Sequence, residues 1–168
     1  LPNDIILDGN LTVSATKYQK ACNVLDALSQ SIESAWAVGS TSKSLLMSYE
    51  ALELCVKNFS DYVNSTDNPI AAQAMIKASN LAGQAINITK TTSAHAWSYG
   101  LTKRYGVPHG HAVWATLPKI FEIHATSHAD LISDPRGPKN LETVIATLMD
   151  ILNITDKEDI GVHFTNML

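Results

Sequence analysis

The stretch of residues 89–117 holds the side chains of this sequence that are best suited to chemistry. It contains His95, His109 and His111, three of the six histidines in the chain. His95 falls in a predicted helix, and His109 lies in a Pro-His-Gly turn just ahead of the next helix. A helix followed by a short break can fold back and bring two imidazoles to one point, where they can bind a metal ion. The spacing of fourteen residues between His95 and His109 therefore predicts half of a metal site, with His111 pointing elsewhere.

A carboxylate and an amide on the first long predicted helix can complete such a site. Asp26 and Gln30 are four residues apart, so they project from the same helix face, one turn apart. Taken alone, Asp26 is more readily explained as a buried polar group that is hydrogen-bonded within the core. Together with two imidazoles, its carboxylate oxygen forms a ligand set that suits Fe²⁺ or Zn²⁺ better than Ca²⁺.

Apolar residues at steps of three and four predict the helices that must position these groups. One helix is expected from Lys17 to Gly39, and a second is expected to follow caps at residues 40–42 and to stop near residue 64. Pro69 is expected in the first turn of a third helix. Gly83 lies inside that third helix, where glycine costs about 1 kcal/mol relative to alanine, so another backbone is expected to pass close to it.

The remainder of the chain also reads as helices joined by loops. Residues 5–7 form a short extended entry segment, and residues 112–125 form a helix that Pro118 should kink or break. Residues 134–138 are expected to be a loop before an amphipathic helix over 141–152, and residues 155–158 match a capping box that opens another helix. No succession of strands is found. The sequence therefore predicts an all-α fold, formed by a single domain over residues 1–168.

Composition excludes several classes of function. The chain of 168 residues is long enough for one domain with a substantial core, and 45% hydrophobic against 17% charged residues is typical of a globular protein. A net charge of −4 without a cluster of basic residues argues against binding to nucleic acid. No apolar run is long enough to cross a membrane. Cys22 and Cys55 lie in apolar helical patterns and are expected to be buried free thiols, which favours the reducing cytoplasm.

Several segments resemble the iron-containing (group III) alcohol dehydrogenases. The segments are DALSQSIES at 26–34, ASNLAG at 78–83, PHG at 108–110 and the opening IILDGNLT at 5–12. The resemblance is specific from about Pro2 to Pro118 and only general beyond Lys119. It implies the multihelical, metal-binding C-terminal domain of the dehydroquinate synthase-like fold. Because the family also has an N-terminal NAD(P)-binding domain, and the chain opens without Met, we interpret the chain as a piece of a longer protein.

The resemblance also assigns roles to residues. Asp26, His95 and His109 match metal ligands of the family. Gln30 stands where the usual motif has a histidine ligand. Because an amide is a weaker ligand, we expect Fe²⁺ or Zn²⁺ to bind loosely or to keep a water in that place. Tyr99 stands where many members have a further active-site histidine, so it is taken as a catalytic residue.

A further run points to the subgroup that includes phosphonoacetaldehyde reductases. This run is INITKTT at 86–92, followed by His95 and then by PHGH at 108–111. Lys90 with Thr91 and Thr92 is then expected to hold a phosphonate or carboxylate group of the substrate. The alternative, a solvated lysine at a helix end beside capping threonines, has equal weight.

The resemblance implies a metal-dependent, NAD(P)-linked reduction of a small aldehyde to a primary alcohol by a homodimer. The metal would act as a Lewis acid, and the nicotinamide would supply hydride. No Gly-rich phosphate loop occurs in this chain, so no NAD(P)-binding residue is assigned and the chain alone is expected to be inactive. Two alternatives stay open: a glycerol dehydrogenase- or dehydroquinate synthase-like activity, and a non-catalytic helical module that binds a metal or a partner.

Overall fold

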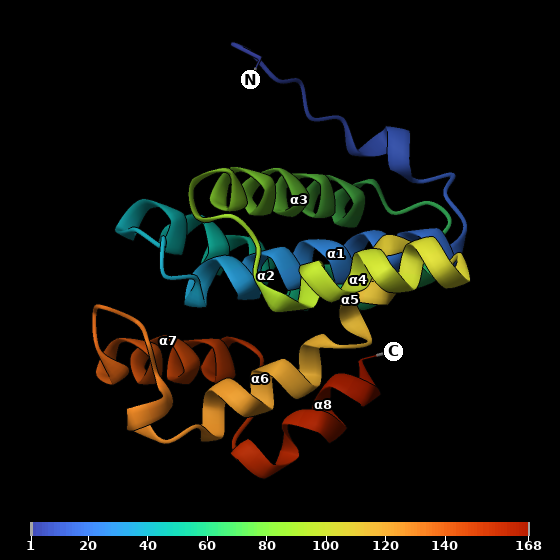
Figure 1. Cartoon of the computed structure of the whole chain (residues 1–168). Coiled ribbons are helices and arrows are strands. Elements are labelled where there is room, and N and C mark those ends of the chain that lie inside the picture. Colours follow the sequence, from blue (N-terminus) through green and yellow to red (C-terminus); the bar gives the residue numbers. More distant parts are fainter. Residues whose placement is uncertain (1, 168) are drawn as a thin grey trace.

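The computed structural model describes residues 2–167, and this part of the chain is all-α, without a strand (Figure 1). The predicted fold class is thus confirmed. Leu1 and Leu168 of the expected single domain lie outside the described residues. None of the described helices is both long enough and apolar enough to cross a membrane.

Three long helices form one layer of the molecule. They are α1 (Lys17–Trp36), α2 (Ser42–Asn64) and α3 (Pro69–Thr89), and each packs against the other two. An extended entry segment and a short 3₁₀ helix, η1 (Gly9–Thr12), lie against α3. Two shorter helices, α4 (Ser93–Tyr105) and α5 (His109–Trp114), contact each other, and α5 contacts α1. Helix α1 therefore lies at the centre of this layer.

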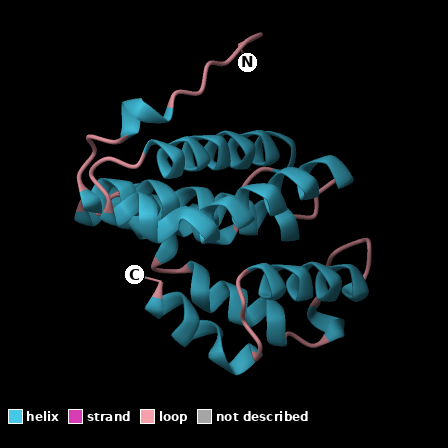
Figure 2. Cartoon of the chain, turned by 180° about the vertical axis from the view of Figure 1, so that it is seen from behind, coloured by secondary structure: helices cyan, strands magenta, loops and turns pink. Residues whose placement is uncertain are grey.

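A second group of helices forms the other layer, below the first in Figure 1 and again in the rear view of Figure 2. It consists of α6 (Leu117–Thr126), η2 (Ala129–Leu131), α7 (Pro138–Ile151), η3 (Lys157–Asp159) and α8 (Ile160–Asn166). One continuous apolar core joins the two layers, and Trp36 of α1 packs edge-on against Phe121 of α6 with ring centroids 5.6 Å apart. Cys22 and Cys55 are buried free thiols, as predicted.

Helix caps explain why the long helices begin where they do. Thr16 and Gln19 form a reciprocal capping box at the start of α1, and Thr41 does the same with Ser44 at the start of α2. The side chain of Asn68 caps α3 ahead of Pro69. The first helix ends at Trp36, three residues before the predicted stop at Gly39.

Of two further sequence predictions, the break at Pro118 is confirmed and the capping box at residues 155–158 is not. Pro118 does lie at a break, because α5 ends at Trp114 and α6 begins at Leu117. The predicted capping box at residues 155–158 is wrong: the cap there is Asp156, whose carboxylate accepts a hydrogen bond from the backbone of Glu158. Asp156 can turn its short side chain onto an amide two residues on, and this forms a 3₁₀ turn instead of a helix start.

The predicted close approach at Gly83 is also wrong. A Cβ atom added there would meet nothing within 4 Å, so the cost of this glycine has no packing cause. The close approaches are at Gly9, where a Cβ would lie 2.4 Å from the backbone nitrogen of Gln73, and at Gly110, where it would lie 1.9 Å from the carbonyl oxygen of Cys22. Only glycine fits at these two contacts.

Candidate metal centre

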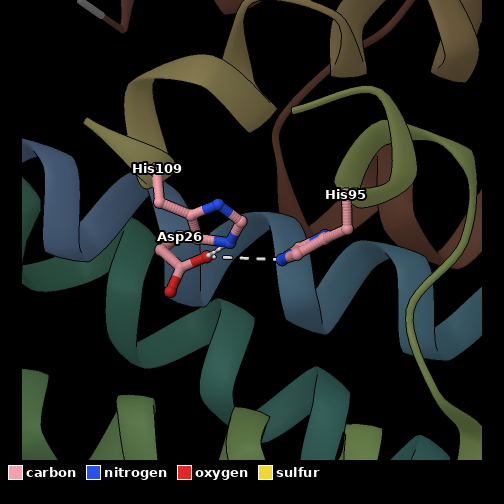
Figure 3. A group of neighbouring side chains, drawn as sticks. All are labelled: Asp26, His95 and His109. Atoms are coloured by element: carbon pink, nitrogen blue, oxygen red, sulfur yellow. Dashed lines mark hydrogen bonds and ion pairs between the residues drawn. The ribbon is translucent and has the colours of Figure 1, made fainter. Parts of the chain in front are cut away.

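Asp26, His95 and His109 converge from three different helices (Figure 3). The Nε2 atom of His95 lies 3.3 Å from Oδ1 of Asp26, and Nε2 of His109 lies 3.6 Å from the same oxygen. One ligand atom from each residue can be chosen so that all three lie within 4.8 Å of one another. Two imidazole nitrogens and one carboxylate oxygen at this spacing fit a divalent transition-metal ion.

The local folding of each element aims its side chain at this point. Asp26 lies in the middle of α1, His95 is in the first turn of α4, and His109 is the first residue of α5. Gly106 ends α4 in the left-handed conformation with φ 69°, which turns the chain back on itself. Gly110 then lets the start of α5 lie directly against α1, because any side chain there would collide with the backbone of α1. This contact brings His109 to Asp26.

Glu33 is a site residue that sequence reasoning missed. Its side chain is fully buried, and one of its carboxylate oxygens contacts Nδ1 of His95. The other oxygen accepts hydrogen bonds from the backbone amides of Thr92 at 3.2 Å and Ala94 at 2.9 Å. A signal for this role was present, because Glu33 follows Asp26 by seven residues and two helical turns place both on one face.

The electrostatics of His95 follow from its two acidic neighbours. Burial of the ring disfavours its charged form, but hydrogen bonds with Asp26 and Glu33, and their negative charges, outweigh this effect and raise the pKa of His95 to about 9. The ring is therefore protonated near neutral pH when it lies between the two carboxylates. A cation that binds at Nε2 must displace this proton.

Gln30 lies beside the three candidate ligands. Its amide nitrogen donates a hydrogen bond of 3.0 Å to Oδ2 of Asp26, so the amide orients the carboxylate whose other oxygen faces the two histidines. The role of Gln30 as a direct ligand stays a prediction. With Asp26, His95 and His109 as ligands, a cation would keep coordination positions open for small molecules.

Tyr99 and Ser98 both contact His109. The ring of Tyr99 stacks on that of His109 with centroids 5.7 Å apart and an interplanar angle of 17°, and the tyrosine is 63% exposed. The hydroxyl of Ser98 lies 3.3 Å from Nδ1 of His109 and donates to the backbone oxygen of His95. Tyr99 thus lies at the solvent side of the centre.

The three residues proposed to bind substrate lie just ahead of α4. Lys90 directly follows α3 and has a positive φ of 67°, and its side chain is exposed. Thr91 is half-buried, whereas the hydroxyl of Thr92 contacts Glu33 and accepts a hydrogen bond of 3.0 Å from Nε1 of Trp36. Lys90 and Thr91 are therefore the members of this group nearer to solvent.

Two other histidines lie apart from the convergence. Nδ1 of His111 lies 2.9 Å from the hydroxyl of Tyr18, and the ring of His124 packs on Trp36 with centroids 4.7 Å apart. Neither belongs to the ligand group found among the described residues. His111 therefore points elsewhere, as the sequence predicts.

The fold and this centre define a helical domain in which residues from three helices could hold a divalent cation. A sequence model of the Fe-containing alcohol dehydrogenase family, C-terminal, matches residues 20–165. The chain belongs to that family and corresponds to its C-terminal domain.

Individual relatives agree with this membership. The chain is 31% identical over 147 residues to the phosphonoacetaldehyde reductase of Streptomyces viridochromogenes, a match that covers 88% of this chain and 37% of that protein. The solved structure of an iron-containing alcohol dehydrogenase from Thermotoga maritima is similar with a TM-score of 0.70 and 28% identity, covering 92% of this chain and 40% of that one. The sulfoacetaldehyde reductase of Bifidobacterium kashiwanohense, solved with NAD⁺, has a TM-score of 0.69 and 28% identity, covering 95% of this chain and 46% of that one. The chain therefore spans less than half the length of these relatives.

Proposed function

We propose that this chain is the metal-binding domain of an NAD(P)-linked dehydrogenase that reduces an aldehyde to a primary alcohol. The observation that carries this proposal is the convergence of Asp26, His95 and His109 on one point. When bound there, Fe²⁺ or Zn²⁺ supplies Lewis-acid polarisation of a carbonyl oxygen. The complete protein is proposed to be a cytoplasmic homodimer that takes NAD(P) from residues outside this chain.

The residues of this chain have separate tasks in that reaction. Asp26 would neutralise charge and hold one side of a bound cation, while His95 and His109 would bind it through the Nε2 atoms that face Asp26. Tyr99 covers the solvent side of His109, so we assign it contact with the substrate. Gln30 keeps the carboxylate of Asp26 in its orientation.

We further propose a substrate that carries an anionic group. The two relatives named as reductases of phosphonoacetaldehyde and of sulfoacetaldehyde both act on small aldehydes with such a group. In this chain Lys90 has an exposed ammonium group and lies two residues before Thr92. The backbone amide of Thr92 donates to Glu33, which also contacts His95. A phosphonate or carboxylate next to Lys90 and Thr91 would gain charge-assisted hydrogen bonds.

Metal analysis of four variants tests the cation site. We expect His95→Ala and His109→Ala to lose tightly bound metal, whereas His111→Ala and His124→Ala retain it, because only the first two face Asp26. The measurement is atomic absorption after dialysis of the purified chain against Fe²⁺ or Zn²⁺. Equal metal content in all four variants would contradict the site and favour the non-catalytic module.

Activity must be tested in the complete protein. We expect NAD(P)H-dependent reduction of an anionic aldehyde by the complete protein, and none by this chain alone. Turnover by the chain alone would contradict the assignment of nucleotide binding to residues outside it.

A further inference from the structure

Glu33 is a buried, charged side chain whose two oxygens contact different parts of the fold. Oε1 accepts hydrogen bonds from the backbone amides of Thr92 and Ala94 and from the hydroxyl of Thr92. Oε2 faces Nδ1 of His95. Burial of an isolated carboxylate is costly, so this set of four donors accounts for its presence in the core.

We propose that Glu33 is a positioning residue of the metal centre, which fixes His95 with its Nε2 atom toward the cation. This inference rests on the proposed function, because it concerns how the chain prepares the site for a cation. The carboxylate accepts the Nδ1 proton of His95, so the ring cannot present Nδ1 to a metal. The other ring nitrogen, Nε2, then faces Asp26, in agreement with its distance of 3.3 Å from Oδ1.

The same carboxylate also places the helix that carries His95. Helix α4 begins without a hydrogen bond from a side chain of its own N-cap residue, Thr92. Glu33 of α1 takes over this task by accepting two backbone amides at the start of α4, where a helix favours negative charge. One group on α1 therefore sets both the position of the α4 terminus and the orientation of its histidine.

His109 is held much more loosely. Its Nδ1 partner is the neutral hydroxyl of Ser98 at 3.3 Å, and its side chain is 38% exposed, against 4% for His95. A charged acceptor orients a ring more strongly than a hydroxyl that also bonds elsewhere. His95 is therefore the preorganised ligand, and Glu33 is the reason.

The variant Glu33→Gln tests this role. Glutamine keeps the size of the side chain, but its single carbonyl oxygen can serve either the α4 amides or His95, and not both. Loss of such an outer partner typically weakens metal binding by about 10- to 100-fold. We expect a loss of that size in the Kd for Co²⁺ and for Zn²⁺, measured by the visible absorption of Co²⁺ and by calorimetry.

Trp36→Phe is the matched control. It removes the Nε1 donor to the Thr92 hydroxyl, and so perturbs the same network at its outer end without touching the contact between Glu33 and His95. We expect this control to lower thermal stability while Kd stays within about twofold, on the order of 0.4 kcal/mol. An equal loss of affinity in both variants would overturn the proposal, since general loosening would then explain it.

A measurement on the unaltered chain keeps the proposal testable if Glu33→Gln fails to fold. In the Zn²⁺-loaded chain, ¹⁵N NMR should show a proton on Nδ1 of His95 and none on Nε2. A proton on Nε2 with metal at Nδ1 would overturn the positioning role. Absence of Co²⁺ and Zn²⁺ binding by the unaltered chain would overturn the proposed function together with it, whereas unchanged binding by a folded Glu33→Gln would overturn only the role of Glu33.

Discussion

Gln30 is the residue at which the candidate centre departs from the ligand pattern that the family resemblance implies. Its amide nitrogen lies 3.0 Å from Oδ2 of Asp26, one helical turn away on α1. The amide nitrogen is thus engaged with the carboxylate, and the amide oxygen is a weaker ligand than the imidazole that the family pattern has at this position.

We expect Gln30→His to tighten metal binding, because imidazole is a stronger ligand for Fe²⁺ or Zn²⁺ than a carboxamide. The gain should be on the order of tenfold in Kd, about 1.4 kcal/mol, measured by calorimetry with Zn²⁺. Gln30→Ala is the control, since it removes the hydrogen bond to Asp26 without adding a ligand. A Kd that does not fall in Gln30→His would mean that position 30 does not face the cation.

The proposed recognition of an anionic substrate rests on Lys90. One charge-assisted hydrogen bond is worth roughly 1.5–3 kcal/mol, which corresponds to about ten- to a hundredfold in affinity. In the complete enzyme we expect Lys90→Ala to raise KM for a phosphonate- or carboxylate-bearing aldehyde by that factor and to leave a neutral aldehyde nearly unaffected. Lys77→Ala, which removes an exposed salt bridge to Glu50, is a control. Equal losses on both substrates would favour a plain alcohol as product.

At the scale of elements, Arg136 joins the loop before α7 to the turn between α1 and α2. Its guanidinium donates to the carbonyl oxygens of Ala37 at 2.9 Å and Ser40 at 3.2 Å, and pairs with Asp134 at 2.7 Å. The hydrogen bonds from Arg136 also lower the pKa of Asp134 below its ordinary value. This pair fixes the end of α1 relative to the second layer.

We expect Arg136→Ala to lower the free energy of unfolding by about 1–3 kcal/mol, because it removes the guanidinium hydrogen bonds to two carbonyl oxygens and to the carboxylate of Asp134. Urea unfolding followed by circular dichroism measures this change. Arg104→Ala, at an exposed position of α4, should change stability by less than about 0.5 kcal/mol. Similar changes in the free energy of unfolding for the two variants would show that the hydrogen bonds of Arg136 between the two loops do not stabilise the fold.

Helix starts could be predicted from the sequence, whereas contacts between helices could not. The starts of α1, α2 and α3 were predicted because caps and apolar periodicity are local signals. Asp26, His95 and His109 were found through a pattern of residue types, and the structure brings them together. Glu33 shares a helix face with Asp26, which the spacing indicates, but its hydrogen-bond partners at the start of α4 follow only from the packing of α4 on α1. Gly110 and Gly83 show the same limit, since only the packing reveals which glycine has a backbone against it.

At the scale of the whole molecule, His124 lies where the two layers meet. Its ring packs on Trp36 of α1, and burial lowers its pKa, although the charge of Glu33 opposes this shift. A histidine with a lowered pKa is neutral in both the folded and unfolded chain well above pH 6.5, so it then adds no pH dependence. As the pH falls below about 6.5, the unfolded chain binds a proton that the folded chain does not, and stability is lost.

We therefore expect the contribution of His124 to the free energy of unfolding of the metal-free chain to fall as the pH drops below about 6.5, and His124→Gln to remove this acid-dependent loss. Urea unfolding at a series of pH values measures how the free energy of unfolding depends on pH in each variant. His128→Gln, an exposed position shortly after α6, serves as the control. An unchanged slope in His124→Gln would assign the acid sensitivity to other groups.

The three candidate ligands are distant in sequence, and this has a consequence for the order of events during synthesis. Asp26 is 69 residues from His95, and His109 comes still later. A ribosome must therefore release α4 and α5, and both must dock on α1, before any cation can meet all three side chains. A metal at the proposed site would meet its full ligand set only after these helices have docked, unlike the metal of a zinc finger, whose ligands are close in sequence. Such a metal would stabilise the finished fold in proportion to the logarithm of its free concentration, so metal starvation is expected to lower the amount of this protein by raising its unfolded fraction.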